Sequence, residues 1–213
     1  MTEGLRERKK RQTRQHISDV ATGLFLERGF DAVTIAEIAA AADVSVNTVY
    51  NYFPAKEDLF LDREDDVVQW LATVVRSRPA GESAAEAVLR ALRAEVVALS
   101  PRLGLIDGYD RFMRVIGRSQ ALRSRLFDMR HRAVGAVVDV LAEEAGAEAD
   151  GPLPALVASQ LGWIHGHVVE FIQHELMAGR TAAEASRAAL GVLDEIETLL
   201  GDRLLGYARR PAV

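Results

Sequence analysis

Residues 34–56, with the sequence TIAEIAAAADVSVNTVYNYFPAK, predict two short helices that meet at a tight turn and lead directly into a third helix. Thr34 can cap the first helix, because Glu37 stands three residues later and can reach back to the cap. Ser45 is a favourable cap for the second helix. Pro54 disfavours helical geometry at the residue before it, so the second helix is expected to end there. The stretch therefore predicts a helix-turn-helix.

The second helix of this motif is expected to expose one polar face. Val46 and Val49 are expected to pack back against the first helix, which turns the polar side chains outward. These side chains are Asn47, Thr48, Tyr50 and Asn51. A helix fits the major groove of B-DNA, where amide and hydroxyl groups pair with base edges. The pattern predicts that this helix reads double-stranded DNA.

The motif continues as V-S-x-x-T-x-Y-x-Y-F and then K-E-x-L, and it resembles the signature of the tetracycline-repressor (TetR) family of bacterial transcriptional regulators. The matching residues are Val44, Ser45, Thr48, Tyr50, Tyr52, Phe53, Lys56, Glu57 and Leu59. A predicted helix from Thr13 to Arg28 also fits, so the resemblance covers about residues 10–60. It implies one set of phosphate contacts and one set of base or phosphate contacts. The first set is Thr34, Tyr50, Tyr52 and Lys56, and the second is Ser45, Asn47, Thr48 and Asn51.

Some motif positions depart from the family or allow another interpretation. Tyr52 stands beside Phe53, which is expected in the core, so the Tyr52 ring could be a core aromatic instead. Many family members have Gly where Asp43 stands, and Gly or Arg where Asn47 stands. An Asn side chain can form hydrogen bonds with adenine, so the operator of a typical member is not expected to apply to this chain.

The formal net charge of the 213-residue chain is −5, but the charge is unevenly distributed. Residues 1–16 carry a net charge of +4 and the rest of the chain carries −9. The basic side chains of this segment are Arg6, Arg8, Lys9, Lys10, Arg11 and Arg14. We expect a basic arm ahead of the first helix that contacts phosphates or the minor groove, or else a solvated tail without such contacts.

The sequence beyond Pro54 predicts helices only, because it lacks the sustained alternation of apolar and polar residues that a half-buried strand needs. We predict an all-α fold of about nine helices. Residues 1–60 are expected to form a three-helix DNA-binding domain, and residues 61–213 a larger helical body. A long helix at about 55–76 could link the two. The resemblance implies that the body binds an effector and forms the dimer.

The last two segments predict an antiparallel helical hairpin, with helices at 153–177 and 181–205 and a short turn between them. Such a hairpin is half of a four-helix bundle. The final segment has more apolar positions than one intramolecular face requires, among them Leu193 and Ile196. In the family that the chain resembles, the equivalent helices pair across a twofold axis. We therefore expect a homodimer whose two reading helices reach successive major grooves.

Aromatic and thioether side chains recur at helical spacing in the middle of the body. The candidates for contact with an unknown small-molecule effector are Tyr109, Phe112, Met113 and Trp163. Ordinary core packing is the alternative, although the resemblance favours an effector pocket. The arginine-rich stretch at 111–132 could attract an acidic effector, or could be a solvated face.

Two patterns that could bind metal ions point more strongly to other roles. His167, Glu170 and His174 share one helical face, but polar residues in such a helix more often form hydrogen bonds with one another than bind zinc. The acidic run at 62–66 has neither a second acidic cluster to match it nor a glycine-rich phosphate loop. We therefore expect no metal, no cofactor and no enzymatic activity.

The chain contains no cysteine, and its basic start is not followed by an apolar segment. No stretch approaches 18 uninterrupted apolar residues, so we expect a cytoplasmic protein without a signal peptide or a membrane partner. The predicted function is a ligand-responsive repressor that binds an inverted-repeat operator as a dimer and is released by a small molecule. The alternatives are a DNA-binding regulator without an inducer and, less compatible with these residues, an all-helical metal-dependent enzyme.

Overall fold

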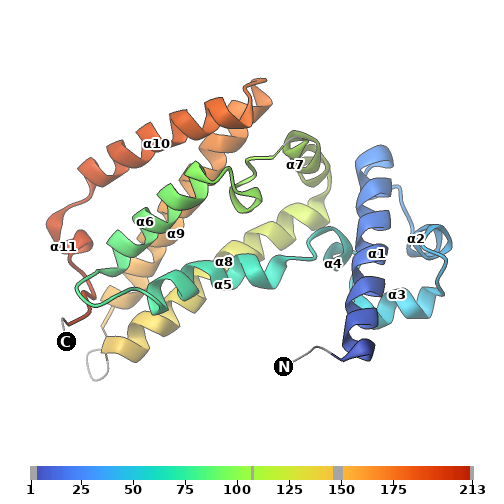
Figure 1. Ribbon diagram of the computed structural model, residues 1–213, viewed down its shortest axis with the longest axis horizontal. Coiled ribbons are helices and arrows are strands. Elements are labelled where there is room, and N and C mark those ends of the chain that lie inside the picture. Colours follow the sequence, from blue (N-terminus) through green and yellow to red (C-terminus); the bar gives the residue numbers. More distant parts are fainter. Residues whose placement is uncertain (1–3, 107, 146–150, 212–213) are drawn as a thin grey trace. The chain divides into compact units, whose positions relative to one another are not determined.

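The computed structural model describes residues 4–106, 108–145 and 151–211. Over these ranges the chain forms eleven α-helices, one short 3-10 helix and no strand, which confirms the predicted all-α fold (Figure 1). The elements are α1 (Leu5–Arg28), α2 (Ile35–Ala41), α3 (Val46–Tyr52), α4 (Glu57–Phe60), α5 (Glu64–Arg76), α6 (Ala84–Val97), η1 (Pro101–Leu103), α7 (Tyr109–Arg118), α8 (Gln120–Ala145), α9 (Leu153–Met177), α10 (Ala182–Leu199) and α11 (Asp202–Leu205).

The chain divides into two compact units. Unit 1 comprises Met1–Glu64 and Arg111–Leu126, and unit 2 comprises Asp65–Asp110 and Phe127–Val213. Helices α5, α7 and α8 therefore each contribute residues to both units. The predicted functional division at residue 60 stays a prediction, because compactness alone does not show which part binds DNA or an effector.

Unit 1 is built around α1, which packs against α2 and α4, while α2 packs against α3. Ile17, Ala21 and Phe25 are fully buried and lie four residues apart, so they form one stripe along α1. The Phe25 ring lies 4.9 Å from Phe30 and 5.6 Å from Phe60, centroid to centroid. This aromatic cluster fixes the loop between α1 and α2 and the short helix α4 on one side of α1.

Residues of α7 and α8 complete unit 1. The Phe112 ring stacks on Phe60 with centroids 4.3 Å apart. The buried Ser119 hydroxyl donates to Asp31 Oδ1 at 2.8 Å. Arg125 forms ion pairs with Glu64 at 2.6 Å and with Asp58 at 3.0 Å. The corner where α7 meets α8 is thus held both to the loop after α1 and to the segment around α4.

Two sequence predictions about unit 1 are wrong. The basic residues do not form an arm ahead of the first helix, because α1 already begins at Leu5. The helix predicted at about 55–76 is broken between α4 and α5. Ser18 on α1 explains the break, since its hydroxyl donates to the Leu59 carbonyl at 3.3 Å and to Asp62 Oδ2 at 2.9 Å. Between α4 and α5, these hydrogen bonds to Ser18 take the place of the backbone hydrogen bonds that a continuous helix would form.

In unit 2, α9 and α10 form the predicted antiparallel hairpin and pack on α6 (Figure 1). The predicted final helix ends earlier than expected, at Leu199, and a separate short helix, α11, follows. Leu193 and Ile196 belong to the buried core of this unit, where they pack with residues of α6 and α9. Their prediction as dimer contacts is therefore wrong, because the chain itself already covers them.

A buried arginine fastens the C-terminal segment to the rest of unit 2. The Arg78 side chain is fully buried, donates to the Ala208 carbonyl at 2.6 Å and forms an ion pair with Glu144. Arg210 forms a second ion pair with Glu144 at 3.1 Å. Breaking such a pair leaves a charge in a poorly solvated place, so these contacts hold the ends of α5 and α8 together with the C-terminal segment. No described helix is long and apolar enough to cross a membrane.

Candidate nucleic-acid interface

The helix-turn-helix begins with the predicted capping box. Thr34 Oγ1 accepts a hydrogen bond from the Glu37 backbone N–H at 3.2 Å, and the Glu37 carboxylate accepts one from the Thr34 N–H at 2.7 Å. This backbone hydrogen bond, together with that from the Arg28 guanidinium at 2.6 Å, lowers the pKa of Glu37 to about 2. Glu37 is therefore ionised at neutral pH and fixes the start of α2. Thr34, expected at a phosphate, is exposed beside this cap.

The turn between α2 and α3 places Asp43 in the left-handed region, with a φ of 54°. The Val44 N–H donates to the Ala39 carbonyl at 3.0 Å across this turn. Glycine adopts this conformation most easily, and Asp tolerates it better than most other residues. The departure from the family's glycine is thus compatible with the same tight turn.

Helix α3 is capped by Ser45, whose hydroxyl accepts a hydrogen bond from the Thr48 N–H at 3.0 Å. The hydroxyls of Ser45 and Thr48 also lie 2.8 Å apart. Val49 is fully buried and anchors the helix, as predicted. The predicted reading residues Asn47, Tyr50 and Asn51 are exposed, whereas Thr48 is half-buried. The outward face of α3 therefore carries two amides and a phenol on a rigid helix.

Val46 lies on this outward face, although the sequence pattern predicted that it packs inward. Its side chain is 41% exposed in the first turn of α3. An exposed apolar side chain on a reading helix can contact the methyl group of thymine. Val46 is thus a candidate base contact that sequence reasoning missed, because hydrophobic periodicity assigns every valine to the core.

Lys56 was expected to contact a phosphate, but the structure turns its side chain inward. Its Nζ donates to the Phe30 carbonyl at 2.6 Å and lies 4.4 Å from the centroid of the Phe30 ring. Burial lowers the pKa of this ammonium group. In this position Lys56 holds the loop between α1 and α2. The exposure of Tyr52 is intermediate, so it is not a fully buried core aromatic.

The four predicted effector residues belong to two different units. Tyr109 belongs to unit 2, where its ring occupies the space that a side chain at Gly104 would need, 2.3 Å from an ideal Cβ. Phe112 and Met113 belong to unit 1, where Phe112 stacks on Phe60. Trp163 is 56% exposed on α9, on the face opposite to the buried core of unit 2. Their role as effector contacts stays a prediction.

His165 on α9 is a partly buried polar group of unit 2. The His165 imidazole lies 5.4 Å from the Trp70 ring, and burial, followed by the charges of Arg130 and Arg102, lowers its pKa to about 4. The Arg102 guanidinium lies 5.7 Å from the Trp70 ring centroid. Position 165 falls beside the apolar stripe of α9, and this pattern is the signal that could have predicted the partial burial of its side chain. Among the described residues, no cluster of three or more His, Asp or Glu is arranged to hold a metal ion.

Comparisons with known proteins agree with this architecture. Residues 17–62 match the model of a family described as bacterial regulatory proteins, tetR family. TcmR, an HTH-type transcriptional regulator of Streptomyces glaucescens, is 29% identical over 152 residues, and the match covers 69% of this chain. It spans 66% of the length of TcmR.

Solved structures share the fold at low sequence identity. Native NalD, the secondary repressor of the MexAB-OprM multidrug efflux pump in Pseudomonas aeruginosa, has a TM-score of 0.57 and 18% identity, with 87% of this chain and 96% of NalD covered. SmeT in complex with triclosan has a TM-score of 0.56 and 19% identity, with 95% of this chain and 99% of SmeT covered. The match of residues 17–62 to this family model and the related regulator agree with the resemblance to the tetR family of bacterial regulatory proteins that the motif in residues 34–56 carries, and the solved structures show the same fold.

Proposed function

We propose that this protein is a DNA-binding transcriptional repressor that reads an inverted-repeat operator as a homodimer and is released by a small molecule. The observation that carries the proposal is the outward face of α3, where exposed Asn47, Tyr50 and Asn51 stand on a helix capped at its start and anchored by buried Val49. A helix that enters the major groove needs this combination of rigid backbone and free polar groups. NalD, which shares the fold, is a repressor, and this supports the direction of regulation.

The side chains of α3 divide into base-reading and phosphate-contacting groups. Asn47 and Asn51 present amides that can pair with adenine N6 and N7. Tyr50 presents a hydroxyl that can donate to a phosphate. Ser45 and Thr48 are already engaged with each other at the cap, so they are proposed mainly to fix the helix start. Lys56 is proposed to act through the loop that it holds rather than at a phosphate.

The exposed face of α9 is proposed as the dimer contact. It presents residues spaced alternately three and four apart, the spacing with which helices pack along one seam. These exposed residues are Leu153, Leu156, Gln160, Trp163, His167, Glu170, His174 and Met177. Large apolar side chains that stay exposed along 25 residues of helix indicate a contact surface. A second copy of the chain fits this role, because a dimer supplies two reading helices for an inverted repeat.

The effector is proposed to bind in unit 2 near His165, Trp70 and Tyr109. His165 is neutral at pH 7 because its pKa is lowered to about 4, so it can donate one hydrogen bond and accept another. Trp70 offers an aromatic face, and burial raises the pKa of the Tyr109 hydroxyl, which therefore stays protonated. This chemistry fits a flat, mostly apolar molecule with a few hydrogen-bonding groups. SmeT binds triclosan, a small molecule, and this supports the general idea of a ligand site in the body.

The signal from the effector is proposed to reach the helix-turn-helix through the corner of α7 and α8. Both helices start or end in unit 2 and place their other part in unit 1. Within unit 1, the Ser119 hydroxyl donates a hydrogen bond to Asp31, and Arg125 forms ion pairs with Asp58 and Glu64. The continuous helix at 55–76 that the sequence suggested for this role is broken, so the corner replaces it. An effector can act only if it prefers the arrangement that binds DNA poorly.

The experiment that tests the DNA-reading proposal is selection of binding sites from a random duplex library with the full-length protein. We expect an inverted repeat, and we expect Asn47→Ala to relax base preference and to cost about 1–3 kcal/mol of binding free energy on the selected site. Gln69→Ala is the control, because it removes an exposed amide from α5, which is not the reading helix. Recovery of no preferred sequence, or equal effects of the two variants, would contradict the assignment of α3.

A further inference from the structure

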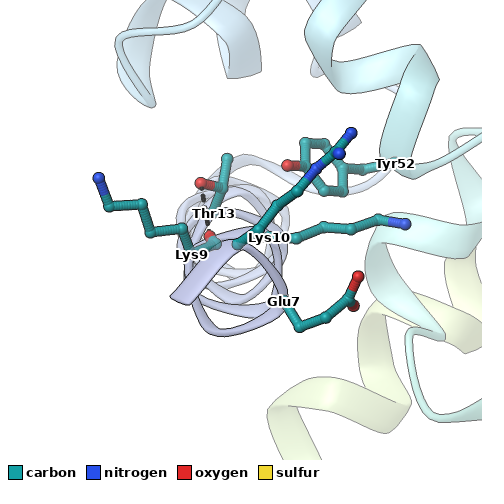
Figure 2. A pocket seen from close by; sticks show the side chains of 6 residues that line it. Glu7, Lys9, Lys10, Thr13 and Tyr52 are labelled. Carbon is teal, nitrogen blue, oxygen red and sulfur yellow. Dashed lines mark hydrogen bonds between the residues drawn. The ribbon is translucent and has the colours of Figure 1, made fainter. Parts of the chain in front are cut away.

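Charged side chains gather in two different settings in this molecule. At the start of α1, Lys9 and Lys10 reach into solvent around an open groove of about 430 Å³ (Figure 2). Beyond the end of α5, by contrast, Arg78 is fully buried, and Glu144 near the end of α8 forms ion pairs with two arginines. A buried charge has to be paired, so it fixes the segments that pair it. The second setting therefore points to a role in holding helix ends together.

We name this second cluster, which consists of Arg78, Glu144, Ala208 and Arg210, the C-terminal clasp. We propose that the C-terminal clasp is the fixed point that makes a displacement of α8 inside unit 2 reach unit 1. This role rests on the proposed function, because it describes how an effector in unit 2 would change DNA binding. The corner of α7 and α8 is the other end of the same path.

The C-terminal clasp ties the last turn of α8 to the residues that follow α5. Arg78 donates to both carboxylate oxygens of Glu144, with Nη1 3.1 Å from Oε1, and to the Ala208 carbonyl at 2.6 Å. Arg210 pairs with Glu144 at 3.1 Å and donates to the carbonyls of Arg76 and Arg78. Two-pronged contacts of an arginine with a carboxylate fix orientation as well as distance. These ends of α5 and α8 are therefore held together while the clasp is intact.

The segment after α11 is held in a conformation that its own residues do not favour. Ala208 has a φ of 51°, in the left-handed region that residues other than glycine rarely enter. The Gly81 N–H donates to the Arg210 carbonyl at 2.9 Å, and the Arg210 N–H donates to the Glu82 carbonyl at 3.2 Å. Such a backbone conformation persists only where the surrounding contacts determine it. The segment is therefore a fixed part of unit 2.

Helix α8 runs from the C-terminal clasp into unit 1. Its first turns belong to unit 1, where Arg125 forms two ion pairs. Between these two ends, α8 packs closely on α9, because an ideal Cβ at Gly162 would lie 2.5 Å from Val134 Cγ2. Gly162 stands three residues before His165 on α9. This contact between α8 and α9 is therefore next to a residue that we propose for the effector site.

A helix that is held at one end moves most at its other end. At about 1.5 Å per residue, Glu144 lies about 15 Å from Val134 and about 28 Å from Arg125 along α8. A displacement of about 1 Å at Val134 therefore becomes about 2 Å at Arg125 if the end at Glu144 stays fixed. Without the C-terminal clasp, the end at Glu144 can move instead, and less of the displacement reaches unit 1.

A methyl group at position 162 takes the place of the unidentified effector in the test. Gly162→Ala puts a Cβ 2.5 Å from Val134 Cγ2, and a valine in a helix has one strongly preferred rotamer. Helix α8 therefore has to move away from α9 by about 1 Å to restore a normal carbon–carbon contact. The double variant Gly162→Ala/Val134→Ala removes the clash, so it controls for the loss of glycine itself.

The first measurement is the binding of full-length protein to the duplex that the wild type selects, by fluorescence anisotropy. Gly162→Ala should lower the affinity about 5- to 50-fold, within the range of allosteric coupling, and Val134→Ala should restore it. Glu144→Gln removes both ion pairs of the C-terminal clasp. In that background Gly162→Ala should change the affinity at most about twofold, because the two substitutions are coupled through α8. Arg210→Gln, which removes one pair, should give an intermediate effect and replaces Glu144→Gln if that variant does not fold.

Arg93→Gln is the matched control for the loss of the C-terminal clasp. Arg93 also pairs with two carboxylates, but it joins α6 to α10, and both of these helices lie within unit 2. Gly162→Ala should keep its full effect in this background, with all variants measured well below their melting temperatures. An equal effect of Gly162→Ala with and without the clasp would overturn the proposal, as would the absence of any effect in the wild-type background.

Hydrogen exchange follows the same path without DNA. Gly162→Ala should speed up exchange in residues 57–64, because Arg125 pairs with Asp58 and Glu64 there, and Glu144→Gln should suppress this increase. Unchanged exchange in Gly162→Ala, or the same increase in both backgrounds, speaks against the C-terminal clasp. A wild-type protein that selects no duplex contradicts the proposed function, and the exchange measurement still decides the role of the clasp.

Discussion

The α2–α3 motif of unit 1 and the α9–α10 hairpin of unit 2 both leave one helix face exposed, but the two faces are chemically opposite. The outer face of α3 is largely polar, and hydrogen bonds between residues three positions apart fix the starts of α2 and α3. The outer face of α9 carries Leu156, Trp163 and Met177, while the opposite face of this helix is buried among residues far away in the sequence. A polar face on a short capped helix suits a hydrated, charged ligand, and a face with several large apolar side chains on a long helix suits another protein surface.

The largest expected effect contrasts the inner and outer faces of the hairpin. Leu193→Asp places a charge at a position that is 0% exposed, so we expect a loss of about 3–5 kcal/mol in the free energy of unfolding. Leu199→Asp is the control, because this leucine on the same helix is 82% exposed and should change the melting temperature little. Thermal unfolding followed by circular dichroism measures both variants. A stable Leu193→Asp variant would show that the core of unit 2 does not include α10.

Trp163→Asp completes this contrast on the outer face of α9. The side chain is 56% exposed in the single chain, so the fold should persist while the proposed dimer dissociates. Because a central aromatic residue often contributes 2 kcal/mol or more to an interface, we expect at least about a 30-fold rise in the dimer dissociation constant. Sedimentation velocity over a concentration series measures it. An unchanged dimer would assign the contact to another surface.

A smaller effect concerns His165 and the pH dependence of unit 2. Its pKa is about 4 in the folded protein and about 6.5 when unfolded, so the unfolded chain binds the extra proton as the pH falls. The contribution of the neutral imidazole is fully present above about pH 6.5 and is lost as the pH falls from there to about 4. We expect a loss of about 1–3 kcal/mol in the free energy of unfolding over this window.

Denaturant unfolding at several pH values tests this expectation. His165→Gln should flatten the pH dependence between about 6.5 and 4, whereas His16→Gln, at an exposed position on α1, should follow the wild type. Identical pH profiles for all three proteins would show that the imidazole is as well solvated in the fold as in the unfolded chain.

The smallest expected effect tests whether the corner of α7 and α8 belongs with the helix-turn-helix. Arg125→Gln removes the partner of Glu64, which is nearly buried, and of Asp58. We expect a loss of about 1–2 kcal/mol, because the arginine itself is partly solvated. Hydrogen exchange should then speed up in residues 57–64, and Arg118→Gln, at an exposed position on α7, should leave it unchanged. Faster exchange confined to unit 2 would separate the corner from unit 1.

The sequence by itself determined the helix-turn-helix and the resemblance to the tetR family. The signals there act over short distances: Thr34 and Glu37 cap one helix, Ser45 caps the next, and Asp43 permits the turn. Each of these hydrogen bonds or backbone conformations involves residues at most a few positions apart, so local preference and final structure agree. The all-α fold and the C-terminal hairpin followed in the same way from periodicity and from short turns.

Only the tertiary structure decided which side chains of these helices stay exposed and which are covered or hydrogen-bonded by distant segments. Ser18 ends the helix that the pattern extended through residues 61–63, because its hydroxyl competes for the carbonyl of Leu59. The Phe30 carbonyl turns Lys56 inward, and the residues of α6 and α9 cover Leu193. Periodicity tells which face of a helix is apolar, but not which distant segment covers it or which polar group it meets. Those contacts join residues tens of positions apart, and no local preference specifies them.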